Sequence, residues 1–253
     1  MRRSLVVAAS ALVALSTAAF APVPAAPQEP SSYAGVLADP IRPAGERGRD
    51  EARHAAETLA FARVAPGQKI ADMIIGGGYF TRIFSAAVGP EGEVTAWQPA
   101  EFIGFQASYG ESLTEVDALP NVDAIRSPIS APEFPSGLDL VFTAQNYHDL
   151  HLAPFPADTA SKVNAAVFQA LKPGGLYVII DHHAAAGSDL AAADSLHRID
   201  IEAVKREVTA AGFILDGESD ILAADADPRT ANVFDDSIRG KTSQFMLRFR
   251  KPA

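Results

Sequence analysis

Short apolar runs and segments of helical spacing alternate along most of this chain. Runs rich in β-branched and aromatic residues predict strands, because such side chains suit the pleated surface of a sheet. These runs cover residues 69–75, 93–97, 122–125, 138–143 and 176–180. Between them, apolar residues recur three and four positions apart, which is the spacing of one helix face. The helices predicted on this basis cover residues 44–64, 79–88, 99–116, 159–171 and 201–211.

The carboxyl-terminal part departs from this alternation. Residues 213–220 and 244–250 have the composition of strands, and residues 223–242 between them read as a long polar loop. Two consecutive strands without a crossover helix predict an antiparallel pair at a sheet edge. The whole pattern predicts an α/β chain with a Rossmann-like doubly wound sheet, mostly parallel, with a carboxyl-terminal antiparallel strand pair.

The first residues have the pattern of a secretory signal peptide. Arg2 and Arg3 precede an apolar stretch rich in Ala, which small residues close. The stretch is shorter than the roughly 20 residues of a membrane-spanning helix, so we favour cleavage over an uncleaved anchor. We therefore expect a signal peptide at residues 1–21, a flexible linker at 22–43 and one α/β domain at 44–253. The mature protein is then periplasmic or secreted, with no membrane contact after cleavage.

Composition narrows the classes of function. The chain has 253 residues, of which 48% are hydrophobic and 21% charged, as expected for one sizeable core. Its formal net charge of -10 opposes binding to the phosphate backbone of nucleic acids. It contains no cysteine, which excludes disulfides and a thiol nucleophile. We expect a small molecule as the partner, and no nucleic acid.

A run of three glycines marks the most distinctive turn of the chain. Gly76, Gly77 and Gly78 follow one predicted strand and precede the next predicted helix. Such a turn leaves backbone N–H groups free at the start of a helix and lets a ligand approach closely. Tight backbone geometry requires glycine in many folds, so the motif by itself fits both a cofactor site and a structural turn.

Four segments match one family in sequence and in order. They read Ala-Asp-Met-Ile-Ile-Gly-Gly-Gly-Tyr-Phe at 71–80, Gly-Glu-Val-Thr-Ala-Trp-Gln at 92–98, Leu-Asp-Leu-Val-Phe at 138–142 and Leu-Lys-Pro-Gly-Gly-Leu-Tyr-Val-Ile-Ile at 171–180. On these motifs the chain resembles class I S-adenosylmethionine-dependent methyltransferases, a Rossmann-like family with a terminal antiparallel strand pair. The resemblance covers nearly the whole predicted domain.

The resemblance implies an S-adenosylmethionine site at the glycine turn. Carried over by position, Asp72 and the three glycines at 76–78 form the cofactor loop. Gln98 stands where the family has an Asp or Glu that binds the ribose hydroxyls, and Ser127 stands near an Asp that contacts adenine. Gln98 still forms hydrogen bonds, but the loss of charge-assisted contacts costs on the order of 1–3 kcal/mol.

Two polar clusters follow neighbouring strands, at residues 146–151 and 181–183. Ligands of open α/β sheets bind beyond the carboxyl ends of the strands, and the resemblance implies a methyl acceptor there. An acceptor must lose a proton, so we expect His148 or His182 to act as general base, with Asp149 or Asp181 orienting the imidazole. The same residues also fit capping and backbone contacts in ordinary loops.

Imidazole and carboxylate groups at converging strand ends also suit a divalent metal ion. His148 and His151 are three residues apart and match no compact zinc signature, so we assign no metal ligand. The function we favour is methyl transfer from S-adenosylmethionine to a small-molecule acceptor. The alternatives are a non-catalytic metabolite-binding protein on the same scaffold, and a metal-dependent enzyme that uses the strand-end histidines.

Overall fold

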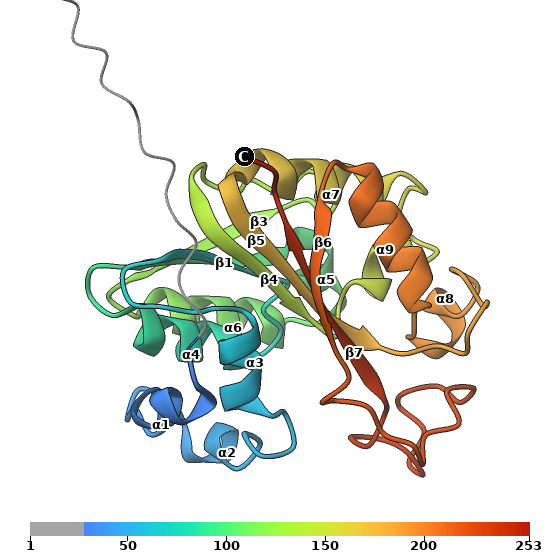
Figure 1. The fold of residues 1–253 in the computed structure, drawn as a ribbon, viewed down its shortest axis with the longest axis horizontal. Coiled ribbons are helices and arrows are strands. Elements are labelled where there is room, and N and C mark those ends of the chain that lie inside the picture. Colours follow the sequence, from blue (N-terminus) through green and yellow to red (C-terminus); the bar gives the residue numbers. More distant parts are fainter. Residues whose placement is uncertain (1–27) are drawn as a thin grey trace, which may run out of the picture.

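Seven strands form a single sheet in the computed structural model, which describes residues 28–253 (Figure 1). Their order is β3-β2-β1-β4-β5-β7-β6. The strands from β1 to β5 are parallel, whereas β7 is antiparallel to both β5 and β6. The bounds are β1 (Lys69–Met73), β2 (Glu93–Pro99), β3 (Val122–Ser127), β4 (Leu138–Ala144), β5 (Leu171–His182), β6 (Ile214–Ser219) and β7 (Gln244–Arg250). This topology confirms the predicted fold class and the antiparallel edge.

Helices cover both faces of the sheet (Figure 1). The helices α3, α4 and α6 lie on one face, and α7 and α9 lie on the other. The α-helices are α1 (Ala34–Leu37), α2 (Ala44–Arg47), α3 (Ala55–Phe61), α4 (Tyr79–Val88), α5 (Ala100–Phe105), α6 (Ser108–Asp117), α7 (Thr159–Ala170), α8 (Ala193–Leu196) and α9 (Ile201–Ala210). The 3₁₀ helices are η1 (Pro30–Tyr33) and η2 (His148–His151).

The central strands are buried on both faces because both faces carry helices. In β1, Ile70 packs toward α3 and α4, while its neighbour Ala71 belongs to the core cluster on the opposite face. Asp72 is the polar exception in this strand and is only 3% exposed. A carboxyl group in the middle of a buried strand therefore needs a partner or a function.

Two helices predicted as continuous are each divided in the structure. The segment 44–64 forms only α2 and α3, and His54 between them has a left-handed φ of 43°. Gly45 and Gly48 lower helix propensity there, and a partly buried ion pair between Arg42 and Asp50 holds the turn. The segment 99–116 divides into α5 and α6.

The predicted signal peptide, residues 1–21, lies outside the described residues. The predicted linker at 22–43 is wrong from residue 28 on, because this part folds as η1 and α1 against the domain. The buried side chain of Tyr33 donates from its hydroxyl to the Val64 carbonyl oxygen at 2.7 Å. The Tyr33 ring also belongs to the core cluster that contains Leu59 and Val64, and this packing positions the Pro/Ala-rich segment on the domain. Among the described residues, no helix is both long and apolar enough to cross a membrane.

The loop between β6 and β7 closes over the carboxyl ends of the strands. A fully buried ion pair between Arg198 and Asp227, with an Nη1–Oδ2 distance of 2.8 Å, holds it to the segment after α8. Asp200 caps α9 by accepting from the Glu202 amide at 3.0 Å. The loop and the α8 region thereby form one wall above the sheet.

Candidate functional site

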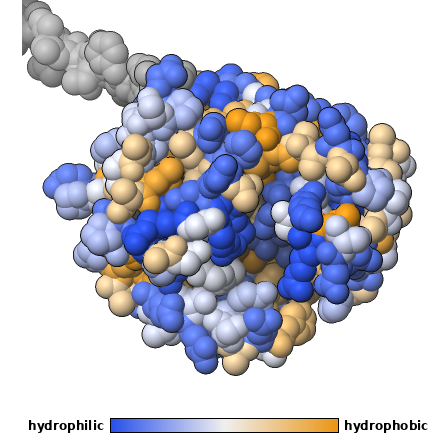
Figure 2. Space-filling model, turned by 90° about the horizontal axis from the view of Figure 1, so that it is seen from below, coloured by the Kyte–Doolittle hydropathy of each residue, from blue (hydrophilic) through white to orange (hydrophobic). Residues whose placement is uncertain are grey.

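A cavity of about 460 Å³ lies beyond the carboxyl ends of β1, β4 and β5. Figure 2 looks onto this end of the molecule, where the surface is hollowed. Its walls come from the glycine turn, η2, the amino-terminal segment, α5 and the loop between β6 and β7. The position agrees with the rule that ligands of open α/β sheets bind where neighbouring parallel strands end.

The glycine turn forms one wall, but its three glycines have different roles. Gly76 and Gly77 line the cavity, and Gly76 has a left-handed φ of 55°. Gly78, also left-handed, faces α6, where an added Cβ would lie 2.6 Å from Cγ1 of Val116. The turn therefore offers its first two glycines to a ligand, while Gly78 permits close packing of α4 and α6.

Asp72 lies at the back of the cavity, below the glycine turn. Its Oδ2 accepts a hydrogen bond from the Thr81 hydroxyl at 2.6 Å. Burial raises the pKa of Asp72 to about 7, an effect that the Thr81 contacts and the Arg53 charge only partly offset. Asp72, the carboxylate predicted for the cofactor loop, thus lines the cavity and has a pKa near neutral.

Gln98 does not line the cavity. Its side chain is fully buried, and its Oε1 accepts from the Gly76 amide at 3.0 Å. Its Nε2 has no hydrogen-bond partner among the described residues. Ser127, the other position where the chain departs from the family, accepts from the Trp97 indole at 2.8 Å. Both side chains support the fold around the site, and Gln98 reaches the glycine turn from behind rather than from the cavity.

Two arginines from the amino-terminal segment line the same end of the cavity. The guanidinium groups of Arg49 and Arg53 lie over the Tyr79 ring, 5.2 and 4.6 Å from its centre. Arg53 also donates to Oε1 of Gln145 at 3.4 Å, and it pairs with no carboxylate among residues 28–253. Burial lowers the pKa of Arg53 to about 10. Sequence reasoning did not find these two arginines, because a helical pattern does not show which surface the segment covers.

Aromatic side chains form the outer walls. Phe102, Phe105 and Tyr109 come from α5 and α6, and Phe234 comes from the opposite loop. Phe105 is 64% exposed and Phe234 is 57% exposed, which is high for large apolar residues at a cavity. The walls therefore offer flat apolar faces to a planar or apolar ligand.

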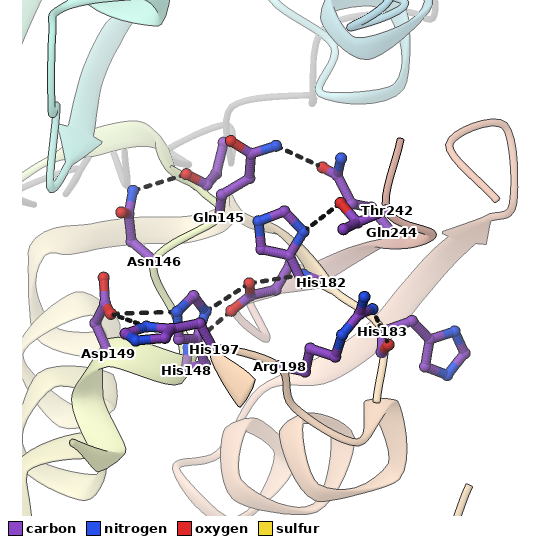
Figure 3. A network of polar contacts seen from close by, with 12 residues as sticks. Gln145, Asn146, His148, Asp149, His182, His183, His197, Arg198, Thr242 and Gln244 are labelled. Carbon is purple, nitrogen blue, oxygen red and sulfur yellow. Dashed lines mark hydrogen bonds and ion pairs between the residues drawn. The ribbon is translucent and has the colours of Figure 1, made fainter. Parts of the chain in front are cut away.

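His148 is the centre of the polar contacts at the ends of β4 and β5 (Figure 3). Its Nδ1 lies 2.8 Å from Oδ1 of Asp181, and its Nε2 lies 3.2 Å from Oδ1 of Asp149. Burial disfavours the charged imidazole, but the Asp181 and Asp149 carboxylates outweigh burial and raise the pKa of His148 to about 10. The two carboxylates therefore favour the imidazolium form of His148, a form that has no free lone pair with which to accept a proton.

His182 differs from His148 although the two rings are neighbours, with centres 6.1 Å apart. Burial lowers the pKa of His182 to about 4, although the nearby Asp181 carboxylate acts in the opposite direction and favours the charged ring. Its Nδ1 lies 2.8 Å from the Thr242 hydroxyl oxygen, and the ring lines the cavity. The structure thus brings the three predicted residues, His148, Asp149 and His182, to one wall and leaves His182 as the neutral imidazole among them. The ring of His183 points away from this group (Figure 3).

No family model matches the chain. Over 124 residues it is 30% identical to an uncharacterized methyltransferase of Synechocystis sp.. The match covers 47% of this chain and 50% of the relative, so it spans about half of that protein's length.

Solved structures share the fold over most of the chain. A SAM-dependent methyltransferase from Aquifex aeolicus matches with a TM-score of 0.57 at 19% identity, over 88% of this chain and 98% of that one. The [4+2]-cyclase SpnF matches with a TM-score of 0.59 at 13% identity, over 85% of this chain and 86% of its own. The fold is that of class I S-adenosylmethionine-dependent methyltransferases, which confirms the resemblance seen in the sequence.

Proposed function

We propose that this chain binds S-adenosylmethionine and transfers its methyl group to a small-molecule acceptor. The observation that carries the proposal is the combination of Gly76 and Gly77 with an unpaired Arg53 at one end of a single cavity. A half-buried guanidinium that faces a cavity without a carboxylate partner favours an anionic group of a ligand. The relatives named above, apart from the cyclase, are methyltransferases by name, and this agrees with the proposal.

The residues present fit the cofactor in charge and shape. Arg53, with Arg49 beside it, suits the carboxylate of the cofactor's methionine part. The aromatic faces of Phe102 and Tyr109 suit a planar base. When bound, S-adenosylmethionine supplies a methyl group on a sulfonium sulfur, an electrophile that needs no further activation. The residues of the protein then have to hold the acceptor and remove its proton.

The acceptor side is the wall with His148, Asp149 and His182. In the tautomer where Nδ1 of His182 donates to Thr242, its Nε2 keeps a lone pair that accepts a proton from an acceptor hydroxyl or amine. Its pKa of about 4 keeps it neutral at physiological pH. The imidazolium of His148 holds Asp149 in place beside it. This assignment makes His182 the base and His148 a positioning residue.

One observation favours a second candidate, a protein that binds a metabolite on this scaffold without methyl transfer. Gln98 is turned into the glycine loop, so the end of β2 offers the cavity no carboxylate for a ribose. SpnF, a cyclase by its name, has a similar fold, so the fold alone does not fix the reaction.

Isothermal titration calorimetry with S-adenosylmethionine, S-adenosylhomocysteine and NAD tests the proposal. We expect the first two to bind and NAD not to bind. Arg53→Met should weaken binding by about tenfold or more, since a charge-assisted hydrogen bond contributes about 1.5–3 kcal/mol. Arg206→Met is the matched control, because Arg206 is exposed, pairs with Asp189 and does not line the cavity.

Failure of both adenosyl compounds to bind would overturn the proposal. Binding without transfer of a labelled methyl group to any component of a small-molecule extract would instead favour the second candidate. An effect of Arg53→Met no larger than that of Arg206→Met would remove the role of the guanidinium.

A further inference from the structure

Three potential metal ligands converge on the acceptor wall of the cavity. His148, Asp149 and His197 each offer one ligand atom, and these atoms all lie within 4.8 Å of one another. Oδ1 of Asp149 lies 3.2 Å from Nε2 of His148 and 4.0 Å from Nδ1 of His197. Within residues 28–253 this is the one group of three or more such side chains with this spacing. All three residues line the cavity, so the point between them is open to a ligand.

The hydrogen bonds around His148 resemble the outer shell of a metal site. Its Nδ1 bonds to Asp181, whose side chain is fully buried and accepts also from the His148 main-chain amide at 2.7 Å. A histidine that binds a metal through one ring nitrogen usually donates from the other to a carboxylate, which fixes the ring and raises its basicity as a ligand. The contact with Asp181 therefore directs Nε2 toward Asp149 and His197 (Figure 3).

His197 is held toward the cluster by an unusual backbone. It follows α8 with a left-handed φ of 53°, a conformation that costs energy for a residue with a Cβ. Its ring lies edge to face with that of His148, with centres 5.4 Å apart, and packs on Phe234 at 4.9 Å. This backbone and this packing place the His197 imidazole with Nδ1 4.0 Å from Oδ1 of Asp149.

We propose that His148, Asp149 and His197 bind one divalent first-row transition-metal ion, with Zn²⁺ as the reference ion. Two imidazoles and one carboxylate suit zinc and its neighbours better than magnesium or calcium, which prefer oxygen ligands. Three protein ligands leave a coordination position for a substrate atom or water. Tetrahedral zinc places ligand atoms roughly 3.3–3.6 Å apart, so only His197, with a side chain 27% exposed, has to move by a fraction of an ångström to about 1 Å.

The role of this metal site rests on the proposed methyl transfer, to which it adds a class of acceptor. The ion takes the place of the hydrogen between Nε2 of His148 and Asp149, and His182 stays free as the base. An acceptor hydroxyl bound at the open position would lose its proton more readily, because a metal ion lowers the pKa of a bound hydroxyl. The inferred acceptor class is thus a metal-coordinating hydroxyl compound with an apolar or planar body that suits Phe105 and Phe234.

The test is direct metal binding by the full chain without any cofactor, so its failure is distinguishable from failure of S-adenosylmethionine binding. Chelator-treated protein is titrated with Zn²⁺ by calorimetry and with Co²⁺ by visible absorption. We expect one ion per chain and a Co²⁺ d–d band of a low-coordinate site with nitrogen ligands. Asp181→Asn, outside the ligand set, should weaken binding by about 10–100-fold.

His197→Asn and Asp149→Asn should each weaken binding at least tenfold. Asn tolerates the left-handed backbone at 197, and its amide is a poor zinc ligand. His183→Asn is the matched control, because His183 packs on Phe245 and does not line the cavity. Circular dichroism verifies that each variant is folded. Absence of saturable binding would overturn the proposal, as would binding that His197→Asn and Asp149→Asn leave as tight as His183→Asn does.

Discussion

The side-chain oxygen of Gln98 accepts the amide hydrogen of Gly76 at 3.0 Å, so the tip of β2 is bonded to the turn that follows β1. The contact joins the position of the family's ribose carboxylate to the family's cofactor loop. In this chain the side chain supports the loop from behind. Exchanging the carboxamide for a carboxylate at this position should therefore affect the stability of the loop more than the affinity for a ligand.

Gln98→Glu should therefore destabilise the protein and should not tighten S-adenosylmethionine binding. The substitution buries a charge that only the Gly76 amide can compensate, at a cost of about 1–3 kcal/mol. Urea unfolding and calorimetry measure the two effects. Gln169→Glu, at an exposed position in α7 that does not line the cavity, is the control. Tighter binding by Gln98→Glu without loss of stability would show that the side chain reaches the ligand.

Substitutions at the adjacent glycines 77 and 78 should have different effects, one on ligand binding and the other on stability. Gly77→Ala has no atom within 4 Å of the added Cβ and projects it at the cavity, so the protein should fold normally and bind the cofactor more weakly. Gly78→Ala has a φ of 78° and meets Val116, so it should lose about 2 kcal/mol or more of stability. Thermal unfolding of both variants with and without ligand tests this. Equal loss of stability in the two would contradict the assignment.

The fold could be predicted from the sequence because its signals are local. The apolar run ending at Gly76, the cap Asp200 and the apolar strand 176–180 each depend on neighbours a few residues away, and all appear in the structure. The error arises where contacts outside the segment decide the structure. Residues 44–64 have helical spacing, yet the Arg42–Asp50 ion pair and tertiary packing override the propensity.

Only those residues of the site that belong to a motif or follow the end of a strand could be predicted from the sequence. Asp72 and His148 follow from the strand pattern, because strand ends meet at one edge of a parallel sheet. Arg53 and Phe234 reach the cavity through the amino-terminal segment and a loop without helix or strand, whose paths depend on contacts such as Arg198 with Asp227. The protonation of the site residues could not be predicted from the sequence either, since it depends on burial and on distances between side chains.

Asp72→Asn should stabilise the protein increasingly as the pH rises. Burial raises the pKa of Asp72 from 3.8 to about 7, so the folded state holds the proton more tightly than the unfolded chain. The resulting stabilisation is complete below pH 3.8 and is lost as the pH rises through 7. Asn does not titrate, so the variant does not lose this stabilisation. Its free energy of unfolding relative to wild type should therefore rise by up to about 4 kcal/mol between pH 3.8 and about 7.

Urea unfolding of Asp72→Asn and wild type between pH 4 and 8 measures the difference. Asp123→Asn, at an exposed position in β3, is the control and should show no such trend. If Asp72→Asn were less stable at every pH, the carboxylate would be charged in the folded protein and compensated by Arg53.

His148→Gln should cost roughly 3–5 kcal/mol of stability, because it leaves the buried Asp181 carboxylate without its partner. The pKa of His148 is raised from 6.5 to about 10, so the stabilisation from the pair is complete below pH 6.5 and is lost as the pH rises through 10. The cost of His148→Gln should therefore be greatest near pH 6 and should shrink toward pH 10. Urea unfolding at pH 6, 8 and 10 measures this dependence.

The double variant His148→Gln, Asp181→Asn should recover part of the stability, since it removes the buried charge together with its partner. A histidine elsewhere should not behave in this way, and His183→Gln, which packs on Phe245, is the control for a change of the same type. A cost of His148→Gln that is independent of pH and unchanged by Asp181→Asn would mean that the ring contributes by packing alone. Recovery in the double variant, with the predicted loss toward pH 10, would establish that Asp181 holds His148 as a charged residue in the metal-free protein.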